Sequence, residues 1–141
     1  MKDLAIIYWS GTGNTEAMAN AIADGAKEAG SSVKLLDVDS ATIEDVTSAS
    51  VLAFGCPSMG DEVLEEMSFE PFIESLEGND IKKPTLLFGS YDWGDGQWMR
   101  EWADRMKGYG SLLINDGHIV NNEPGDDDIK ELQDLGASLV K

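Results

Sequence analysis

This sequence has few of the residues that build disulfides, metal sites and anion-binding surfaces. One cysteine and one histidine among 141 residues leave no internal disulfide and no companion ligands for a metal. We therefore expect a reducing, cytoplasmic location and no metal site. Ten lysines and arginines stand against 27 aspartates and glutamates, which gives a formal net charge of −17. This charge repels nucleic acid and anionic membranes; it either attracts a basic protein partner or only keeps the chain soluble.

Long apolar runs are also missing. No run approaches the roughly 18 residues of a membrane-spanning helix, so we expect no membrane association. No repeat, low-complexity tract or linker divides the chain. With 42% hydrophobic residues, residues 1–141 predict a single domain with a core of its own, and we expect a monomer.

Short apolar segments alternate with helical patterns along the chain. Apolar, β-rich segments predict five strands, the last of them bent near Gly117: residues 4–9, 33–38, 51–55, 85–89 and 112–120. Apolar residues at helical spacing predict four helices and a short helical turn: residues 16–29, 69–76, 98–106, 129–139 and 43–46. This alternation predicts an α/β fold, a doubly wound five-stranded parallel sheet with helices on both faces.

Three loops rich in small and polar residues follow three of the predicted strands. They comprise residues 10–15, 56–62 and 90–96. Ligands of doubly wound sheets bind beyond the carboxyl ends of the strands, near the point where the strand order reverses. We therefore expect the three loops to meet at one edge of the sheet and to form a binding site.

The first loop, SGTGNT at residues 10–15, has the chemistry of an anion site. Backbone N–H groups at the start of the following helix carry partial positive charge, and the glycines Gly11 and Gly13 let the backbone approach an anion closely. Neutral donors complete the loop: Ser10, Thr12, Asn14 and Thr15. A plain capped turn between strand and helix is the alternative.

Two common nucleotide loops are excluded at this position. The triphosphate loop G-x-x-x-x-G-K-[ST] needs a lysine, and none occurs between Lys2 and Lys27. The dinucleotide fingerprint G-x-G-x-x-G needs a third glycine, but position 16 is a glutamate. A single phosphate held by neutral donors is the interpretation that remains.

Four segments, in order, resemble the flavodoxins, a family of small proteins that carry FMN. YWSGTGNTE at 8–16 resembles their phosphate loop, and three further matches follow: CPSMGDEVLEE at 56–66, FGSYDWGDG at 88–96 and NNEP at 121–124. The last strand shows no long insertion, which is similar to the short-chain clostridial type. The resemblance implies the strand order 2-1-3-4-5 and a non-covalent FMN at the edge where the loops meet.

The resemblance also implies which residues hold FMN. Met59 and Trp93 would sandwich the flavin ring, and Glu62 would accept a hydrogen bond from flavin N3–H. The carbonyl of Gly60 would accept a hydrogen bond from N5 after a peptide flip that accompanies the first electron. Asn122 would bond the ribityl chain. The full implied set is Ser10, Gly11, Thr12, Gly13, Asn14, Thr15, Pro57, Ser58, Met59, Gly60, Asp61, Glu62, Ser90, Tyr91, Asp92, Trp93, Gly94 and Asn122.

Two residues depart from the family pattern. Asp92 stands where close relatives usually have glycine, and it adds a negative charge beside the pyrimidine end of the flavin. A left-handed backbone conformation at this position would cost aspartate energy. Pro57 stands where a serine can help to hold the phosphate. Tyr91, which precedes Asp92, is expected to be a loop aromatic near the ring edge.

The charge of the site predicts the direction of its redox chemistry. A phosphate without a cationic partner opposes the anionic hydroquinone of the flavin; at ~8 Å and an effective dielectric constant of ~20, each unit of charge costs ~2 kcal/mol, or roughly 90 mV. We predict a low-potential one-electron carrier, not an enzyme, that shuttles mainly between neutral semiquinone and anionic hydroquinone. The alternatives are an FMN-dependent NAD(P)H quinone or nitro reductase and a flavin-free acidic binding domain.

The partners predicted for this carrier are redox proteins with basic docking surfaces. Encounters of this kind are small and transient, and electrostatics controls their rate and orientation. The acidic rim expected to guide them comprises Asp61, Glu62, Glu65, Glu66, Asp92, Asp95 and Asp126–Asp128.

Overall fold

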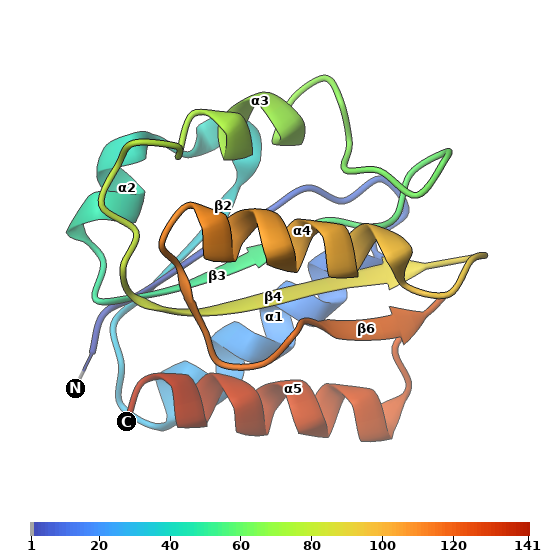
Figure 1. Cartoon of the computed structure of the whole chain (residues 1–141). Coiled ribbons are helices and arrows are strands. Elements are labelled where there is room, and N and C mark those ends of the chain that lie inside the picture. Colours follow the sequence, from blue (N-terminus) through green and yellow to red (C-terminus); the bar gives the residue numbers. More distant parts are fainter. Residues whose placement is uncertain (1) are drawn as a thin grey trace.

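The computed structural model describes residues 2–141 as strands and helices that alternate around one sheet (Figure 1). The strands are β1 (Leu4–Tyr8), β2 (Val33–Asp37), β3 (Val51–Gly55), β4 (Pro84–Tyr91), β5 (Leu112–Leu113) and β6 (His118–Asn121). The helices are α1 (Asn14–Glu28), α2 (Ile43–Ser48), α3 (Phe69–Glu74), α4 (Gln97–Gly108) and α5 (Asp126–Leu139), with a 3₁₀ turn η1 (Val38–Ser40). Within residues 2–141, no helix is both long enough and apolar enough to span a membrane.

All neighbouring strands run parallel, in the order β2-β1-β3-β4-β5, and β6 also pairs with β4. The predicted order 2-1-3-4-5 is therefore confirmed. The single bent fifth strand is a correction: β5 pairs with the start of β4 and β6 with its end, so two segments share that position. The break lies at Gly117, whose φ is +106° and whose N–H donates to the side chain of Asn115 at 2.8 Å.

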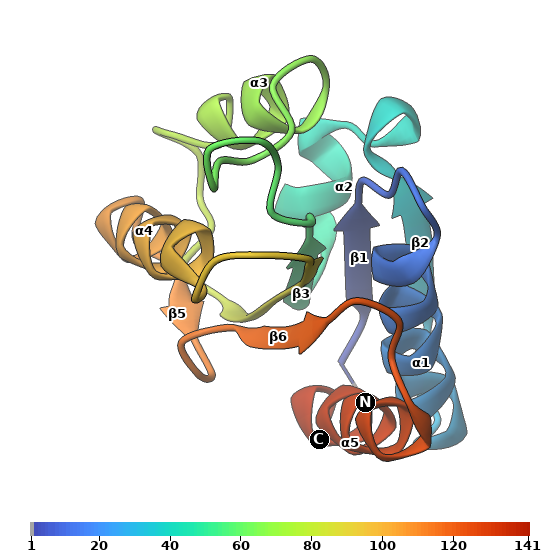
Figure 2. The same cartoon turned by 90° about the vertical axis from the view of Figure 1, so that its right-hand side faces the viewer.

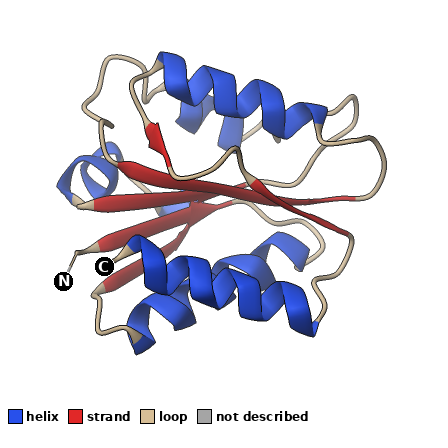
Figure 3. Ribbon diagram, turned by 60° about the horizontal axis from the view of Figure 1, so that its bottom comes forward, coloured by secondary structure: helices blue, strands red, loops and turns tan. Residues whose placement is uncertain are grey.

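The sheet lies between two helical layers (Figure 3). Successive residues of a strand point to opposite faces, so β1 supplies both cores. Ile7 packs in the core shared with α2, α3 and α4, whereas Ile6 packs in the core shared with α1 and α5. Every residue of β1 and β3 is buried, as expected for central strands covered on both faces.

Helices α1 and α5 approach each other closely enough for their backbones to touch. A Cβ atom at Gly25 would lie 1.9 Å from the carbonyl oxygen of Gln133, and one at Gly136 would lie 2.1 Å from that of Ile22. Only glycine leaves room for this contact, because real Cβ atoms do not approach other heavy atoms within 3.0 Å. The pair of glycines therefore fixes the distance between the two helices on this face.

The carboxyl ends of β1, β3 and β4 point to the same edge of the sheet (Figure 2). The loops that follow these strands meet there, as the sequence predicts. The segment from β6 to α5 reaches the same edge, because β6 pairs with the end of β4. This edge holds the candidate site.

Candidate functional site

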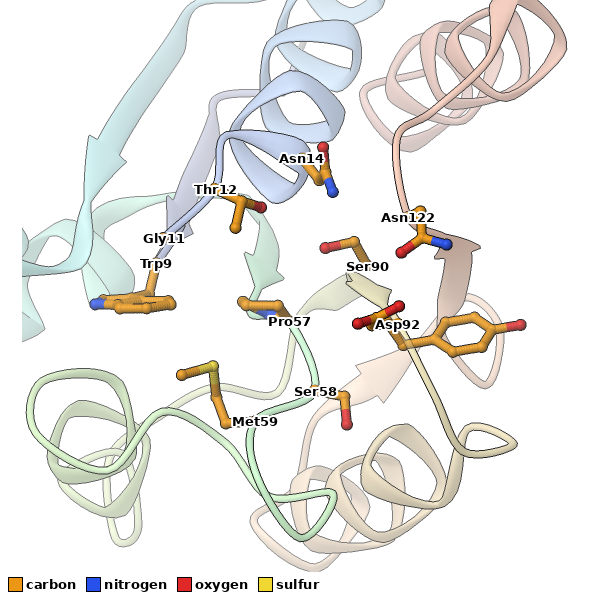
Figure 4. Close-up of a pocket in the computed structure, with 11 residues that line it drawn as sticks. Trp9, Gly11, Thr12, Asn14, Pro57, Ser58, Met59, Ser90, Asp92 and Asn122 are labelled. Carbon is orange, nitrogen blue, oxygen red and sulfur yellow. The ribbon is translucent and has the colours of Figure 1, made fainter.

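A cavity of about 240 Å³ opens where the three loops meet (Figure 4). Its lining comes from all three loops and from the segment after β6: Trp9, Gly11, Thr12, Asn14, Pro57, Ser58, Met59, Ser90, Tyr91, Asp92 and Asn122. Ten of these eleven residues belong to the predicted set, and Trp9 does not. Six of the eight predicted residues outside the lining, Gly60, Asp61, Glu62, Trp93, Gly94 and Thr15, are placed below.

The remaining two, Ser10 and Gly13, shape the loop that begins α1. The Ser10 hydroxyl oxygen accepts hydrogen bonds from the N–H groups of Gly13 and Glu16, each at 3.2 Å. Gly13 precedes the helix in the left-handed region with φ 99°, and because glycine has no side chain, it cannot cap the helix with one. Among the hydrogen bonds of residues 2–141, the N–H groups of Asn14 and Thr15 have no acceptor. Two donors at a helix N-terminus are thus free for an anion.

Thr15 ties the start of α1 to the end of β4. Its hydroxyl lies 3.0 Å from the hydroxyl of Ser90, and the pair is buried. Thr15 therefore acts behind the cavity wall, while Ser90 reaches the cavity itself. The hydrogen bond fixes the first-loop side of the cavity relative to β4.

Trp9 is the lining residue that the sequence analysis missed. Its indole lies over the first loop: a Cβ atom at Gly11 would come within 2.9 Å of Trp9 Cη2. The backbone N–H of Trp9 donates to the carbonyl oxygen of Gly55 at 3.0 Å, and this hydrogen bond holds Trp9 at the end of β1 beside β3. The available signal is an aromatic residue directly before a Gly-rich loop, but the apolar strand pattern of residues 4–9 includes the same residue.

The second loop turns sharply below the cavity. Met59 and Val63 exchange two backbone hydrogen bonds, of 2.9 and 3.1 Å, and Met59 lines the cavity. Between them, Gly60 has φ +38° and no heavy atom within 4 Å of a built Cβ position. Asp61 is exposed at the tip of this turn. The left-handed backbone at Gly60 is the conformation that glycine tolerates best.

Glu62 joins the second loop to the third. Its φ is +56°, and its carboxylate accepts a hydrogen bond from the N–H of Gln97 at 3.1 Å, at the N-terminus of α4. A Cβ atom at Gly94 would lie 2.5 Å from the same carboxylate. Glycine at position 94, with φ +92°, therefore makes room for this contact. The expected hydrogen bond from Glu62 to the flavin N3–H stays a prediction.

Glu65 corrects the expected acidic rim. The residue is 7% exposed, and its carboxylate accepts hydrogen bonds from three backbone N–H groups, those of Met67, Ser68 and Phe69, at 2.8–2.9 Å. Burial raises the pKa of this carboxyl group, but the three donors together outweigh burial and hold the pKa below its usual value. Glu65 thus shapes the start of α3 and does not face a partner.

Of the five predicted residues in the third loop, Ser90, Tyr91 and Asp92 line the cavity, whereas Trp93 and Gly94 lie outside the lining. Asp92 lines the cavity with an ordinary negative φ, so the backbone cost considered for aspartate does not arise. Trp93 is 59% exposed and lies outside the lining, so the predicted sandwich with Met59 stays a prediction. Tyr91 ends β4 and packs against Trp98, with ring centroids 5.7 Å apart. It is therefore a strand residue, which corrects the expected loop position.

Asn122 completes the cavity from the segment after β6. It has φ +60°, a conformation that asparagine tolerates better than most residues. Its N–H donates to the carbonyl oxygen of Tyr91 at 2.8 Å, which continues the pairing of β6 with β4 by one residue. The side chain is thereby brought to the cavity opposite Thr12 and Asn14 (Figure 4).

The cavity contains no cationic side chain among the described residues that line it. Asp92 is its one carboxylate. Free N–H groups and neutral hydroxyl and amide groups stand on the α1 side, and Trp9, Pro57 and Met59 provide apolar surface (Figure 4). This set of groups fits a phosphate monoester joined through a polyol to a flat aromatic ring, and FMN has this chemistry.

The comparisons with known proteins agree with this chemistry. Residues 6–137 match a family model described as Flavodoxin. The chain is 50% identical to a flavodoxin of Clostridium beijerinckii over 86% of this chain and 88% of the relative, and 43% identical to one of Megasphaera elsdenii over 96% and 97%. The solution structure of the two-electron reduced Megasphaera elsdenii flavodoxin superposes with a TM-score of 0.81 at 42% identity, and covers 96% of this chain and 98% of that one. Oxidised flavodoxin 1 of Bacillus cereus gives 0.88 at 26% identity, with 98% and 97% covered.

Proposed function

This chain belongs to the flavodoxin family of FMN-binding electron carriers, and on that premise we propose that it moves one electron at a time at low potential. Its FMN would work mainly between the neutral one-electron-reduced form and the anionic two-electron-reduced form. The close relatives are carriers rather than enzymes, so the alternative of an NAD(P)H reductase is not retained. We further propose that the chain works in the cytoplasm as a monomer.

The described residues offer a partner for each part of FMN. The free N–H groups of Asn14 and Thr15, with the hydroxyl of Thr12, would hold the phosphate. The side chains of Ser90 and Asn122 would bond the ribityl hydroxyls. Met59 would cover one face of the flavin ring. The ring would supply the one-electron chemistry when FMN is bound. Trp93, on the exposed third loop, would cover the other face.

The observation that carries the proposal is the cavity without a cation. A phosphate held only by neutral donors keeps its charge and opposes a second negative charge on the ring. For an assumed separation of ~8 Å and an effective dielectric constant of ~20, each unit of phosphate charge contributes ~2 kcal/mol, or roughly 90 mV before screening. This effect lowers the redox potential at which the flavin takes up the second electron.

Gly60 would favour uptake of the first electron, because it would stabilise the one-electron-reduced flavin. Its left-handed φ of +38° and its open surroundings permit a peptide flip that turns its carbonyl toward the protonated N5 of the flavin. One such hydrogen bond contributes roughly 0.5–1.5 kcal/mol, up to about tenfold in the population of the one-electron-reduced form. We expect Gly60→Ala to lower the amount of this form in an anaerobic redox titration followed by absorption. An unchanged amount would remove the flip from the proposal.

The partners would be basic redox proteins that dock on the cavity edge. Exposed acids surround this edge: Asp61, Glu66, Asp92, Asp95, Asp126 and Asp127. Asp128 is half-buried, and its carboxylate accepts a hydrogen bond from the backbone N–H of Gly125 at 2.9 Å. Two large apolar side chains, Met67 at 85% and Trp93 at 59% exposure, stand among the exposed acids. A short-lived complex with such a centre and rim forms faster at low ionic strength. Transfer to a basic haem protein should slow strongly as salt is added, and a flat response would leave the acids with a role in solubility only.

The proposed function is tested by titrating the FMN-loaded protein with electrons under anaerobic conditions. We expect absorption of the neutral one-electron-reduced form to accumulate before full reduction. Direct passage to the fully reduced form, with no such absorption, would contradict the proposal.

A further inference from the structure

We propose that Asp92 is a residue that sets the redox potential, because it opposes the negative charge that the second electron brings into the cavity. The inference rests on the proposed function and assigns part of the low potential to one side chain. Asp92 would touch FMN directly as part of the cavity wall. Its contribution would add to that of the phosphate.

Asp92 is the one carboxylate among the described residues that line the cavity. Its carboxylate is directed toward the space between Pro57, Ser90 and Asn122 (Figure 4). Neither an ion pair nor a hydrogen bond to this carboxylate occurs within residues 2–141. Asp95, three residues later, shows the contrast, because it pairs with Arg100 at 2.9 Å. The charge of Asp92 is therefore left to act on the contents of the cavity.

The backbone around Asp92 is held in place from β6. Tyr91, directly before it, pairs with Asn121 in the sheet, and its carbonyl oxygen accepts the N–H of Asn122 at 2.8 Å. The Asn121 side-chain amide donates to the carbonyl oxygens of Tyr91 and Asp92, at 3.2 and 3.4 Å. Three hydrogen bonds from β6 and its end thus fix the start of the third loop. The carboxylate is consequently presented to the cavity by a fixed backbone.

A carboxylate in this position distinguishes bound forms by charge. It accepts hydrogen bonds from hydroxyl groups, so it tolerates the neutral ribityl chain and a neutral ring. The second step adds one electron, supplied by the donor protein, and no proton, so one negative charge appears in the cavity. Asp92 opposes that charge and leaves the first step, which adds an electron and a proton together, nearly unchanged.

The test uses the FMN-loaded protein with Asp92→Asn, which keeps the size of the side chain and removes its charge. At low ionic strength we expect the equilibrium constant of the second step to rise about threefold, which is about 30 mV at 59 mV per tenfold change, with the first potential unmoved. The difference should shrink as salt is added. FMN affinity of the oxidised protein, measured by fluorescence, should change less than the second potential does.

Asp24→Asn is the matched control, because this substitution removes the same charge. Asp24 is exposed on α1, toward the end of the helix that is remote from the cavity. Its second potential should stay close to that of the unchanged protein. A shift in Asp92→Asn no larger than this control, or an equal shift of both potentials, would overturn the inference and leave the proposed function standing. A second potential in the unchanged protein equal to that of free FMN would overturn the proposed function itself.

Discussion

The helical layer of α1 and α5 and the edge that holds the cavity are built in opposite ways. In the layer, two glycines, Gly25 and Gly136, bring backbones into direct contact, and nothing larger fits. At the edge, the backbone takes less common conformations at Glu62 and Asn122, and the apolar Trp93 is largely exposed. The comparison indicates that stability is concentrated in the layer, whereas the edge gives up some stability to present a site. Substitutions in the two regions should therefore have separable effects.

The largest expected effect is in the helical layer. Gly25→Ala places a methyl group 1.9 Å from the carbonyl oxygen of Gln133, so α1 and α5 must move apart. We expect the free energy of unfolding, measured with urea, to fall by about 3 kcal/mol or more, despite the better helix propensity of alanine. Gly108→Ala in α4 is the control, since nothing lies within 4 Å of its Cβ position, and it should be neutral or slightly stabilising. Equal effects from the two variants would contradict the account of the layer.

Glu65 is a buried charge at the edge, and its removal should have the next largest effect. Glu65→Gln replaces a carboxylate that accepts three backbone hydrogen bonds. We expect a loss of about 2 kcal/mol in the free energy of unfolding at neutral pH. The exposed neighbour Glu66 serves as a control, and Glu66→Gln should change stability by no more than a few tenths of a kcal/mol.

The loss in Glu65→Gln should depend on pH, because the pKa of Glu65 is lower in the folded protein than in the unfolded chain. The stabilisation is fully present above the unfolded value of about 4.3 and is lost as the pH falls through the folded value. Urea curves of the two proteins should therefore converge below pH 4. A constant difference down to pH 3 would show that the effect comes from packing and not from the charge.

The smallest expected effect is at the contact between the second and third loops. Gly94→Ala strains a backbone with φ +92° and pushes against the carboxylate of Glu62. Gly110→Ala is the matched control, since Gly110 has φ +100° but no neighbour within 4 Å. Both should lose about 1 kcal/mol from strain, and Gly94→Ala alone should also weaken FMN binding. Equal FMN affinities would mean that the Glu62 contact does not shape the cavity.

The fold was largely predictable because the sheet follows from hydrophobic periodicity and from the order of strands, helices and loops along the chain. Apolar strands, helical spacing and the three loops after β1, β3 and β4 determine a parallel sheet with its ligand at one edge. The break between β5 and β6 was not predictable in the same way, because it depends on the left-handed Gly117 and its local hydrogen bond to Asn115. A turn of this kind leaves no periodic trace in the sequence.

The site was predictable where loop chemistry decides it and not where neighbours decide it. Thr12, Asn14 and Met59 were placed at the cavity from sequence, and the structure lines the cavity with them, whereas Ser10 and Thr15 lie outside the lining. The role of Glu65 was wrong, because an acid in an acidic stretch gives no sign that three backbone N–H groups will surround it. Trp9 was missed because its indole covers a glycine two residues along the chain, which an apolar strand pattern does not indicate.

The most direct test of the central claim is the potential of the second electron in the FMN-loaded protein, measured beside free FMN in the same buffer. An uncompensated phosphate and an acidic cavity wall predict a bound potential that lies far below the free one, by roughly 90 mV or more, and that rises as salt is added. A bound potential equal to that of free FMN at every salt concentration would contradict the account.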